Sequence, residues 1–589
     1  MIADIKSMWR SVIFNAVKSV AVELTGSSDS MTEDDILIGK PPKSEMGDIA
    51  VPFFTFAKSL RRAPAQIAQL TLEALNTFEE RPAGEISVAG PYLNIRIDTV
   101  ALATSLKETL DNNKGAYGET DSHAGKKIMV EFSCPNTNKP LHLGHMRNDS
   151  IGESISRILK ANGADVRKVN LINDRGVHIC KSMLAYQRFG NGDTPQSTGI
   201  KSDHFVGKYY VKFAQWAKED PSAEKEAQAM LSKWEAGEPE IIELWERMNR
   251  WTIDGILETY KTTGISFDDF YYESKTYMKG RDEILKGLED GVFYKDEEGT
   301  VWIDLEPIKL DKKVLLRKDG TSLYLTQDIG TAIARHKDWP FDSLIYVVGS
   351  EQKYHFTVLF YVLSQLGLSW AEQLYHLSYG MVNLTEGRMK SREGTVVDAD
   401  DLFAKLKQMA SDEITAKGRE SEVGDIERTA SSVALGALNY YLLQVNPNKD
   451  MIFDPKDSLS FTGNTGPYLQ YMGARICSML KKYESISEEV DTYSFDPALL
   501  VETEERELIK LLAGYPEVVM AAGADMNPSL IASYLFDLSK LYSKFYHDHP
   551  ILRCEDKRMI KARVTLSTMA LQVLKNAFTL IGIPFLESM

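Results

Sequence analysis

Two histidines at the start of a predicted helix, His142 and His145, are the residues whose spacing most directly suggests chemistry. A short apolar run with β character, residues 127–130, precedes them, and residues 146–159 repeat apolar side chains with helical periodicity. Both rings can therefore point the same way from a helix start, where free N–H groups and the helix dipole favour an anion. Gly144 lets a flat base or a ribose approach the backbone. This pattern predicts a phosphate site built from imidazoles rather than from a glycine-rich loop.

The residues around the two histidines decide between this interpretation and a simpler one. A histidine pair at this spacing is more often a surface feature or a metal pair than a nucleotide site. Residues 133–147, however, read Ser-Cys-Pro-Asn-Thr-Asn-Lys-Pro-Leu-His-Leu-Gly-His-Met-Arg. This string resembles the first signature of the class I aminoacyl-tRNA synthetases, and in this form that of the arginyl-tRNA synthetases. The resemblance implies an ATP-dependent ligase that joins L-arginine to tRNA(Arg) through an arginyl-adenylate, releasing AMP and pyrophosphate, with Mg²⁺ accompanying ATP.

A second basic segment, residues 387–397, begins roughly 245 residues after His142. A basic, glycine-flanked loop is usually a solvated turn, but this one resembles the second signature of the family, the KMSKS loop. It departs from that pattern, because Lys390 falls at the serine position and Ser391 falls where the second lysine belongs. Arginyl-tRNA synthetases with this departure commonly carry a lysine before the first histidine, and Lys139 stands there.

The resemblance assigns charge stabilisation on the phosphates to both signatures. The residues are Lys139, His142, His145, Arg388, Lys390, Ser391 and Arg392. It assigns ATP binding to a partly overlapping set, namely His142, Gly144, His145, His355 and Met389. A phosphoryl-centred transfer needs positioning and charge stabilisation more than covalent chemistry. No side chain is an evident general base for the later transfer to tRNA.

An arginine substrate requires carboxylates that pair with its planar fork of donors, and an aromatic face or a hydroxyl that positions it. Asp328, Tyr324 and Glu273 supply those types, and the resemblance places all three around the guanidinium. Asp328 has an ordinary alternative, because an aspartate that opens a helix is often only its N-cap. The resemblance also implies side chains around the α-amino and carboxylate groups: Ser133, Asn136 and Gln352.

The elements that must position these residues form a predicted doubly wound parallel sheet. Residues 128–132, 147–162 and 165–172 read as strand, helix and strand. A continuous apolar run at 343–348 is typical of a buried parallel strand. Gln352 follows at its carboxyl end, where such sheets bind ligands.

Turn and capping residues give further local predictions. Residues 173–178 predict a helix opened by an acidic cap, and 319–330 predict a turn, a strand and a helix start. Residues 301–305 and 313–317 predict paired strands, and 111–115 predict a linker.

The length of 589 residues predicts several domains, since single cores rarely grow beyond about 250–300 residues. We expect a multidomain α/β protein with an N-terminal α+β domain at 1–115, a Rossmann-like catalytic domain at 116–410 and an all-α helical bundle at 411–589. Residues at about 190–265 predict a helical insertion with a solvated charged face. The resemblance implies that the first domain contacts the tRNA elbow, the insertion lies near the acceptor end, and the third binds the anticodon.

Within the terminal domains the predictions are more local. Residues 5–24 and 64–75 predict helices, and 89–97 alternate like a strand. In the C-terminal domain three residues after a Gly-Pro turn are either core and surface or stack on unpaired bases of RNA. They are Tyr468, Tyr471 and Arg475.

Composition indicates the kind of cellular compartment in which the protein works. The chain is 43% hydrophobic, has no apolar stretch long enough to span a bilayer and shows no signal peptide. Its four cysteines are far apart, with neither disulfide nor zinc spacing, which fits a reducing cytoplasm. A net charge of −16 argues against indiscriminate nucleic-acid binding but allows a local basic surface. We expect a cytoplasmic monomer.

Two other functions are considered. One is a nucleotidyl transferase of the same superfamily acting on a small molecule, which the large helical C-terminal part argues against. The other is a catalytically silent tRNA-binding relative, which the intact first signature argues against. An amino-acid-dependent exchange assay with labelled pyrophosphate, with and without tRNA, distinguishes all three.

Overall fold

The computed structural model describes residues 1–28, 31–318, 324–384, 397–416, 418–419 and 423–589. The chain divides into two compact units. The first comprises Met1–Gly118, Arg475–Val519 and Tyr534–Asn576, and the second comprises Glu119–Ala474, Met520–Ser533 and Ala577–Met589.

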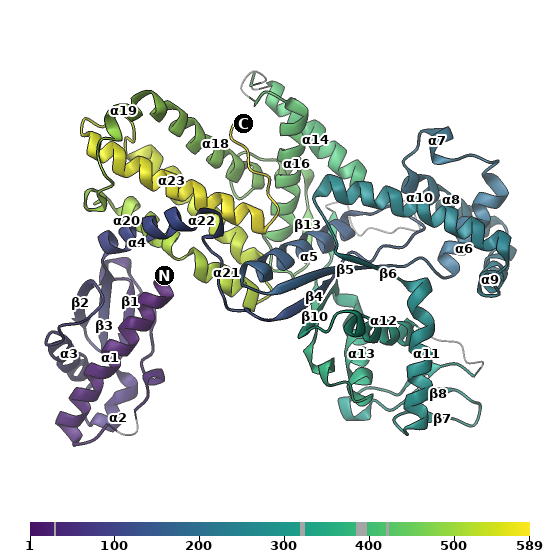
Figure 1. Ribbon diagram of the computed structural model, residues 1–589, viewed down its shortest axis with the longest axis horizontal. Coiled ribbons are helices and arrows are strands. Elements are labelled where there is room, and N and C mark those ends of the chain that lie inside the picture. The colour runs from purple at the N-terminus through teal and green to yellow at the C-terminus, as the bar shows by residue number, and fades with distance from the viewer. Residues whose placement is uncertain (29–30, 319–323, 385–396, 417, 420–422) are drawn as a thin grey trace. The chain divides into compact units, whose positions relative to one another are not determined.

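A five-stranded, all-parallel sheet organises the second unit (Figure 1). Its strands are β4 (Lys127–Glu131), β5 (Asp165–Ile172), β6 (Asp269–Tyr272), β10 (Ser343–Gly349) and β11 (Leu374–Tyr379). They lie in the order β11-β10-β4-β5-β6, so the direction of winding reverses between β4 and β10. The carboxyl ends of these two strands form the switch point where such sheets bind ligands. The predicted doubly wound sheet is confirmed, and β5 has the predicted bounds.

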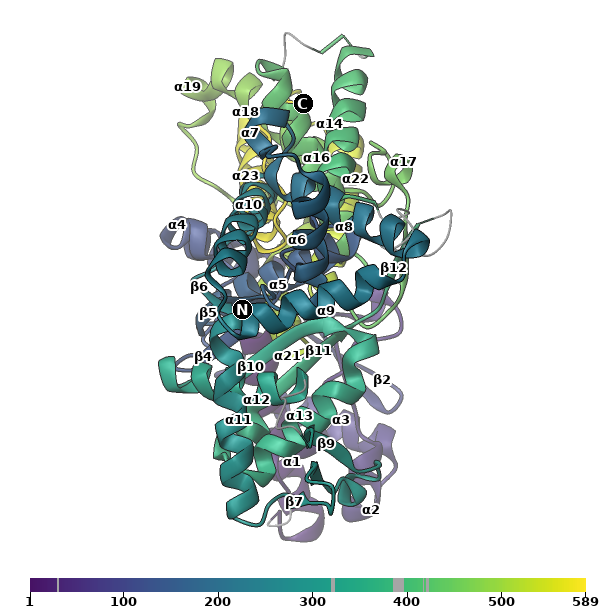
Figure 2. The ribbon, with the colours of Figure 1, turned by 90° about the vertical axis from the view of Figure 1, so that its right-hand side faces the viewer.

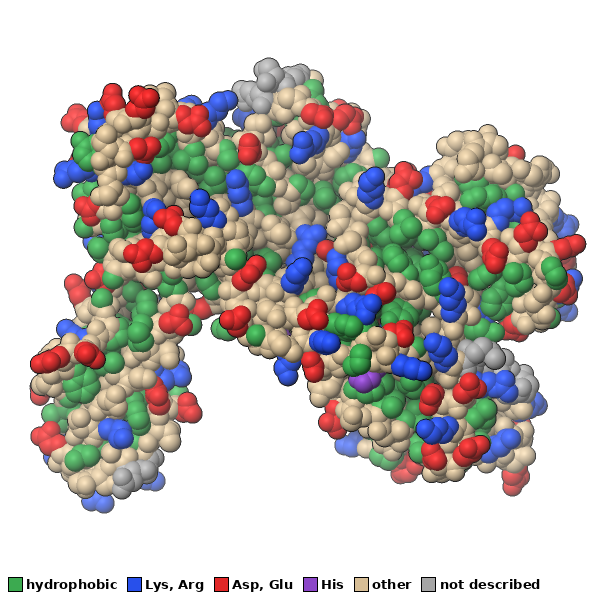
Figure 3. Space-filling view, in the orientation of Figure 1, with side chains coloured by type: hydrophobic (Ala, Val, Ile, Leu, Met, Phe, Trp, Pro, Cys, Tyr) green, Lys and Arg blue, Asp and Glu red, His purple; other side chains and the backbone are tan. Residues whose placement is uncertain are grey.

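Helices enclose the sheet and form the predicted insertion. The first signature opens α5 (Leu143–Ala161), which begins four residues before the prediction. Helix α6 (Val177–Phe189) precedes the expected insertion at about 190–265, which contains α7 (Pro195–Thr198), α8 (Ser202–Glu219), α9 (Ser222–Glu235) and α10 (Pro239–Thr263). The insertion has its own aromatic core, which includes Phe205, Tyr209 and Phe213. Figure 3 shows acidic and basic side chains interspersed over these helices, as expected for a solvated charged face.

Two helices that carry predicted arginine-site residues lie side by side (Figures 1 and 2). They are α11 (Glu273–Glu289) and α12 (Tyr324–Asp338). Gly280 and Gly330 meet at their contact, where a Cβ added to Gly330 would lie 2.3 Å from the Gly280 nitrogen. The predicted paired strands are confirmed as β8 (Val301–Ile303) and β9 (Lys313–Leu316), which join β7 (Tyr294–Lys295) in an antiparallel sheet. Helix α13 (Lys353–Gln365) follows β10.

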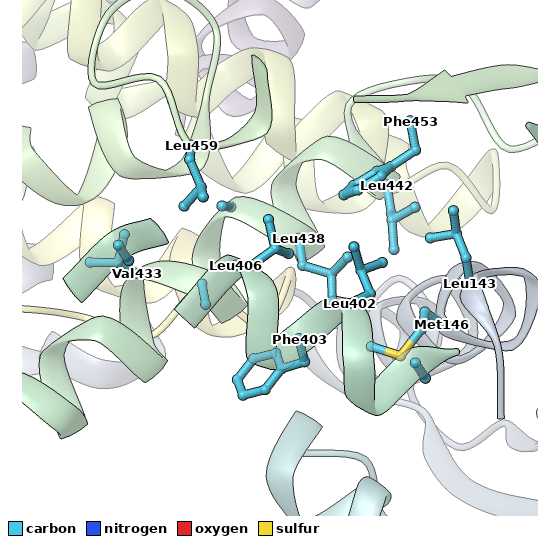
Figure 4. Close-up of a cluster of buried hydrophobic side chains, with 14 of the residues drawn as sticks. Leu143, Met146, Leu402, Phe403, Leu406, Val433, Leu438, Leu442, Phe453 and Leu459 are labelled. Carbon is cyan, nitrogen blue, oxygen red and sulfur yellow. The ribbon is translucent and has the colours of Figure 1, made fainter. Parts of the chain in front are cut away.

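A helical layer packs on the first signature (Figure 4). Leu143 and Met146 of α5 meet Leu402 and Phe403 of α14 (Ala399–Ala416). The same core includes Leu438 and Leu442 of α16 (Ile426–Leu443) and reaches Phe453 of β13 (Met451–Phe453). Strand β13 pairs in parallel with β12 (Val382–Leu384). Helix α18 (Gly466–Tyr483) begins after the Gly-Pro turn, as predicted.

The first unit combines the N-terminal module with C-terminal helices. Its three strands are β1 (Ile49–Pro52), β2 (Gly84–Ala89) and β3 (Tyr92–Ile97), in the order β1-β3-β2. Its helices include α1 (Ile2–Thr25), α3 (Pro64–Leu75), α4 (Thr99–Asn112), α20 (Thr503–Ala513) and large parts of α22 (Ser529–Asp548) and α23 (Lys557–Leu580). The Tyr117 hydroxyl donates to the carbonyl of Leu512 at 2.9 Å. Segments nearly four hundred residues apart therefore share one unit.

Four local predictions were wrong. The strand expected at 89–97 is a hairpin, because Gly90 takes a left-handed φ of 58° and turns the chain between β2 and β3. The linker expected at 111–115 begins inside α4, which continues to Asn112.

The acidic helix cap expected at 173–178 is absent from that described segment, since Gly176 is the N-cap of α6 and Asp174 bonds Ser274 instead. Residues 324–330 are helical from the first residue, with no strand among them. In the part of the chain described here, no helix is long and apolar enough to cross a membrane.

Candidate active site

The histidine pair of the first signature closes the start of α5. His142 is the N-cap, and its Nδ1 accepts a hydrogen bond from the Gly144 N–H at 3.1 Å. The His145 Nδ1 accepts from the His142 N–H, also at 3.1 Å, and the two ring centroids lie 3.9 Å apart. Because each Nδ1 is an acceptor, the proton of each neutral ring resides on Nε2. The pair therefore offers two N–H donors beside a helix N-terminus.

The electrostatics keep both rings neutral. Burial, with the nearby Lys139 charge, lowers the pKa of His142 to about 4. Burial and the neighbouring His142 and Lys139 lower the pKa of His145 well below its usual value. Burial also lowers the pKa of Lys139. The site thus combines neutral imidazole donors with one ammonium group, which suits phosphate oxygens.

A pocket of about 220 Å³ opens beside these residues, between residues 139–142 and the insertion helix α8. Lys139 and His142 line one side, and His204, Lys208 and Tyr210 line the other. The helix approaches closely because Gly207 faces Pro140, where an added Cβ would lie 2.7 Å from the proline Cδ. The insertion therefore supplies one wall of the pocket beside Lys139 and His142.

At the switch point, Asn148 joins the ends of β4 and β10. Its Oδ1 accepts from the Ser133 N–H at 2.6 Å, and its Nδ2 donates to the Val347 carbonyl at 2.7 Å. Ser133 has a left-handed φ of 72° and shares a 2.5 Å hydrogen bond between its hydroxyl and that of Tyr260. Burial raises the pKa of Asp149, which adjoins this network, to about 8. The ends of β4 and β10 are thus joined by a polar, hydrogen-bonded network.

Two predicted arginine-site carboxylates, Asp328 and Glu273, lie close enough to act on each other electrostatically. The Asp328 Oδ2 lies 2.6 Å from His355 Nε2. Glu273 is only 8% exposed, and burial raises the pKa of its carboxyl to about 7, with the Asp328 charge raising it further and Arg175 opposing the shift. With its amide oriented to satisfy both neighbours, Gln327 donates to Glu273 Oε1 at 2.7 Å and accepts from Arg175 Nη1 at 3.0 Å. Two carboxylates with unmet capacity for a cation fit a guanidinium.

A buried ion pair lies close to Asp328. Glu131, at the end of β4, pairs with Arg335 of α12, and both side chains are almost fully buried. The Arg335 guanidinium lies over the Tyr271 ring, 4.9 Å from its centroid. Burial raises the pKa of Glu131, Arg335 opposes this shift, and the Asp328 charge adds to it. The pair fixes α12, and with it Asp328, against the central strand.

The other residues predicted for the arginine and ATP sites differ in their exposure and contacts. Tyr324 is the first residue of α12 and is 69% exposed, and Gln352 is exposed after β10. Asn136 is half-buried and its backbone pairs with Asn173. The N-cap alternative for Asp328 is wrong, because α12 begins at Tyr324. His355, expected at ATP, contacts Asp328 of the arginine group.

The remaining predicted residues belong to the second signature and to the expected RNA contacts. Arg388, Met389, Lys390, Ser391 and Arg392 lie outside the described residues. Tyr471 packs on the helical core, with the Arg419 guanidinium 5.7 Å from its ring centroid. Tyr468 is half-buried, and Arg475 lies over the Tyr546 ring at 5.6 Å.

Sequence reasoning missed Asn148, Asp149, Gln327 and the pair of Glu131 with Arg335. A signal existed for some of them. Asn148 lies three and seven residues before Ile151 and Ile155, so helical periodicity places a polar amide on the apolar face. Arg335 likewise lies three residues after Ala332, on the same face of the helix. A polar residue on a buried face predicts a hydrogen-bonded partner.

Family models match nearly the whole chain. The catalytic domain of class I tRNA synthetases (R) matches residues 106–455, and the DALR anticodon binding domain matches 469–589. The arginyl tRNA synthetase N-terminal domain matches 8–97.

Relatives of known activity are similar over their full length. The arginine–tRNA ligase of Treponema denticola is 57% identical, and the similarity covers 100% of both chains. That of Borrelia hermsii is 45% identical over the same full extent. The structure of Thermus thermophilus arginyl-tRNA synthetase superposes with a TM-score of 0.77 at 24% identity, covering 99% of this chain and 100% of that one. The likeness at this identity shows the fold.

Proposed function

This chain belongs to the arginyl-tRNA synthetases of class I, and from that membership we propose how its side chains divide the work of the reaction. It is an arginine–tRNA ligase: with ATP it joins arginine to tRNA(Arg). In the first step the arginine carboxylate attacks the α-phosphorus of ATP, the bond to pyrophosphate breaks, and arginyl-adenylate forms. In the second step a terminal ribose hydroxyl of the tRNA attacks the adenylate and AMP leaves.

We propose that Glu273 and Asp328 hold the guanidinium of arginine. The observation that carries this assignment is the proximity of the two carboxyls: burial raises the pKa of Glu273 to about 7, and the Asp328 charge contributes to the rise. Tyr324 would position the guanidinium from the start of α12. Ser133, Asn136 and Gln352 would contact the α-amino and carboxylate groups.

We propose that His142 and His145 donate their Nε2–H groups to ATP phosphates, with Gly144 letting the nucleotide approach and His355 and Met389 completing the ATP contacts. Mg²⁺ would stabilise charge on the phosphates. It would be held mainly by phosphate oxygens and water, because Asp398 in the adjoining pocket already accepts N–H bonds from Asp400 and Asp401. The basic residues Arg388, Lys390 and Arg392, with Ser391, would approach the same phosphates.

We further propose that Lys139 supplies the cation that Ser391 cannot. Lys139 adjoins His142, and no other lysine lies in the first-signature string. Lys139→Ala should lower the rate of adenylate formation by about 10²–10³-fold, the scale for removing one preorganised donor to a transition state. The KM for arginine should move little. Single-turnover activation measures this, with Lys160→Ala, an exposed lysine at the end of α5, as control.

If Lys139→Ala forms arginyl-adenylate at the wild-type rate, the missing cation comes instead from the basic residues at 388–392.

The overall assignment is tested by pyrophosphate exchange with tRNA present: exchange should depend on arginine and fail with other amino acids. Exchange that ignores arginine would contradict it.

We propose that the three matched regions act at three places on the tRNA. The N-terminal domain at 1–115 would contact the elbow, the insertion within 116–410 the acceptor end, and the helical domain at 411–589 the anticodon, through Tyr468, Tyr471 and Arg475. We also propose a cytoplasmic monomer; the wide spacing of the four cysteines along the sequence fits a reducing compartment. Light scattering of the purified protein tests the monomer.

A further inference from the structure

A cluster of charged residues, the Lys201 cluster, lies between the insertion and the start of α14. It consists of Lys201, Asp203, His204, Thr259 and Asp400. The Lys201 ammonium lies 2.7 Å from Asp400 Oδ2, 3.1 Å from Asp203 Oδ2 and 2.6 Å from the Thr259 hydroxyl oxygen. His204 Nε2 lies 2.9 Å from the same Asp400 oxygen, and the Thr259 hydroxyl donates to the other at 2.9 Å. Asp400 thus has partners from two segments of the insertion.

The cluster is a closed ion-pair network rather than a metal site. Asp203, His204 and Asp400 bring three potential ligand atoms together, but the Lys201 ammonium already bonds both carboxylates. These hydrogen bonds hold the pKa of Asp400 near 2, against the opposing effect of burial. Asp203 is fully buried, so loss of the lysine would leave a buried carboxyl without its cation.

The backbone links this cluster to the histidine pair. The Leu143 N–H donates to the Val397 carbonyl at 3.1 Å, and the Ala399 N–H donates to the Leu141 carbonyl at 3.0 Å. His142 and Asp398 pair between them as an antiparallel bridge. Asp400 therefore lies two residues from the backbone pair that fixes the residue proposed to donate to ATP.

We propose that Lys201 and Asp400 are positioning residues for the ATP site, which hold segment 397–399 in register with 141–143 and so set the place of His142. The inference rests on the proposed phosphate role of His142. The insertion thereby acts on adenylate formation through the backbone, in addition to any contact with tRNA. The arginine pocket is built on α11 and α12 and does not share this connection.

The test is the kinetics of pyrophosphate exchange with tRNA present, measured separately against ATP and arginine. Lys201→Met should lower kcat/KM for ATP by about 10–100-fold, the scale expected when a reacting group is displaced by about an ångström. The KM for arginine should stay within about twofold. If Lys201 contributes only to general stability, Lys201→Met should instead lower kcat/KM for ATP and for arginine together.

A double-mutant cycle and a matched control test whether Lys201 and Asp400 act through their ion pair. Asp400→Asn should lower kcat/KM for ATP as Lys201→Met does, and the loss in the double variant should be smaller than the product of the two single losses, because both variants remove the ion pair between Lys201 and Asp400. Lys181→Met is the control. Lys181 of α6 pairs with Glu224 of the insertion at 2.8 Å. Its side chain is 18% exposed, against 21% for Lys201, but it does not reach segment 397–400. The control should keep wild-type kinetics.

Unchanged kcat/KM for ATP in folded Lys201→Met overturns the proposal, as does an equal rise in KM for arginine. If Lys201→Met does not fold, His204→Ala removes the second bond to Asp400, and should lower kcat/KM for ATP by about 3–10-fold. A normal value in that variant overturns the proposal as well. His142→Ala measured in parallel separates the two hypotheses: if it too leaves ATP kinetics unchanged, the phosphate site is misassigned, and otherwise only the positioning role fails.

Discussion

At the scale of the residue, Asp328 already has one partner before arginine arrives, because His355 lies 2.6 Å from its carboxylate. Asp328→Asn keeps the size of the side chain and removes the charge. A guanidinium that loses one carboxylate partner in a buried site loses roughly 3–5 kcal/mol. The KM for arginine should therefore rise by about two orders of magnitude or more while the KM for ATP changes little.

Steady-state exchange kinetics measure this prediction. Asp338→Asn is the matched control, since Asp338 ends the same helix but is exposed. Wild-type arginine kinetics in Asp328→Asn would remove Asp328 from the pocket and leave it only a partner of His355.

Glu273 gives a second prediction, which concerns pH. Burial raises its pKa to about 7, so in the free enzyme the carboxyl is protonated and neutral below that pH. A neutral carboxyl cannot pair with a guanidinium, so the KM for arginine should rise as pH falls below about 7, by up to about tenfold per unit. Above that pH the KM should be level.

The measurement is the KM for arginine across about pH 5.5–8.5 in wild type and Glu273→Gln. The variant should bind arginine weakly and without this dependence. A persisting dependence would assign the titration to Asp149, whose pKa burial raises to about 8.

The residue types of the pocket could be predicted from the sequence, but their pairings could not. Glu131 and Arg335 lie on separate elements and become partners only when α12 packs beside β4. The ring atoms that bond at His142 and His145 depend on cap geometry that spacing leaves open. Side-chain partners distant in sequence are determined by packing, which periodicity does not specify.

At the scale of the element, the contact of Gly280 with Gly330 determines how far apart Glu273 and Asp328 lie. Gly330→Ala would place a methyl group 2.3 Å from the Gly280 nitrogen, so α11 and α12 must separate. Overpacking of this kind destabilises by about 1–3 kcal/mol. We expect a lower melting temperature together with a higher KM for arginine.

Thermal unfolding and exchange kinetics check both effects. Gly115→Ala is the control, because an added Cβ there meets nothing within 4 Å. A normal KM for arginine at lowered stability would show that the spacing of the two helices does not matter for the pocket.

Element bounds were predictable where strong local signals coincide. Pro64 begins α3, and the Gly163 turn, with φ of 89°, separates α5 from β5. The hairpin at 84–97 was missed because its alternating pattern continues through the turn at Gly90. An alternating pattern that runs through a turn does not show where one strand ends and the next begins.

At the scale of the whole molecule, the N-terminal module shares a unit with helices near the other end of the chain. Lys510 of α20 bonds Asp48 at 2.7 Å, and the other oxygen of Asp48 accepts from the Ile97 N–H at 2.9 Å. Lys510→Met should destabilise the β1–β3 region by about 1–3 kcal/mol, since the pair is largely but not fully buried.

Hydrogen exchange should then be faster at Ile97 than in the wild type. Lys107→Met, which breaks the exposed pair of Lys107 with Asp111, should leave that amide unchanged. Equal protection of Ile97 in Lys510→Met would contradict the link. The sequence predicted a separate N-terminal module, and no local pattern could reveal that it shares a unit with α20.

The use of ring nitrogens as helix caps has a consequence for proton uptake. An Nδ1 that accepts an N–H bond cannot also take a proton, so acid that charges either ring must open the first turn of α5. His142 binds a proton less readily when folded, with a pKa near 4 against an ordinary 6.5, so its contribution to stability is complete above about pH 6.5 and is lost as pH falls towards 4. Acid inactivation should therefore begin at the start of α5 and spread along the helix from there, rather than start at the periphery. The ring C–H resonances of His142 and His145 should report this opening before the rest of the molecule unfolds.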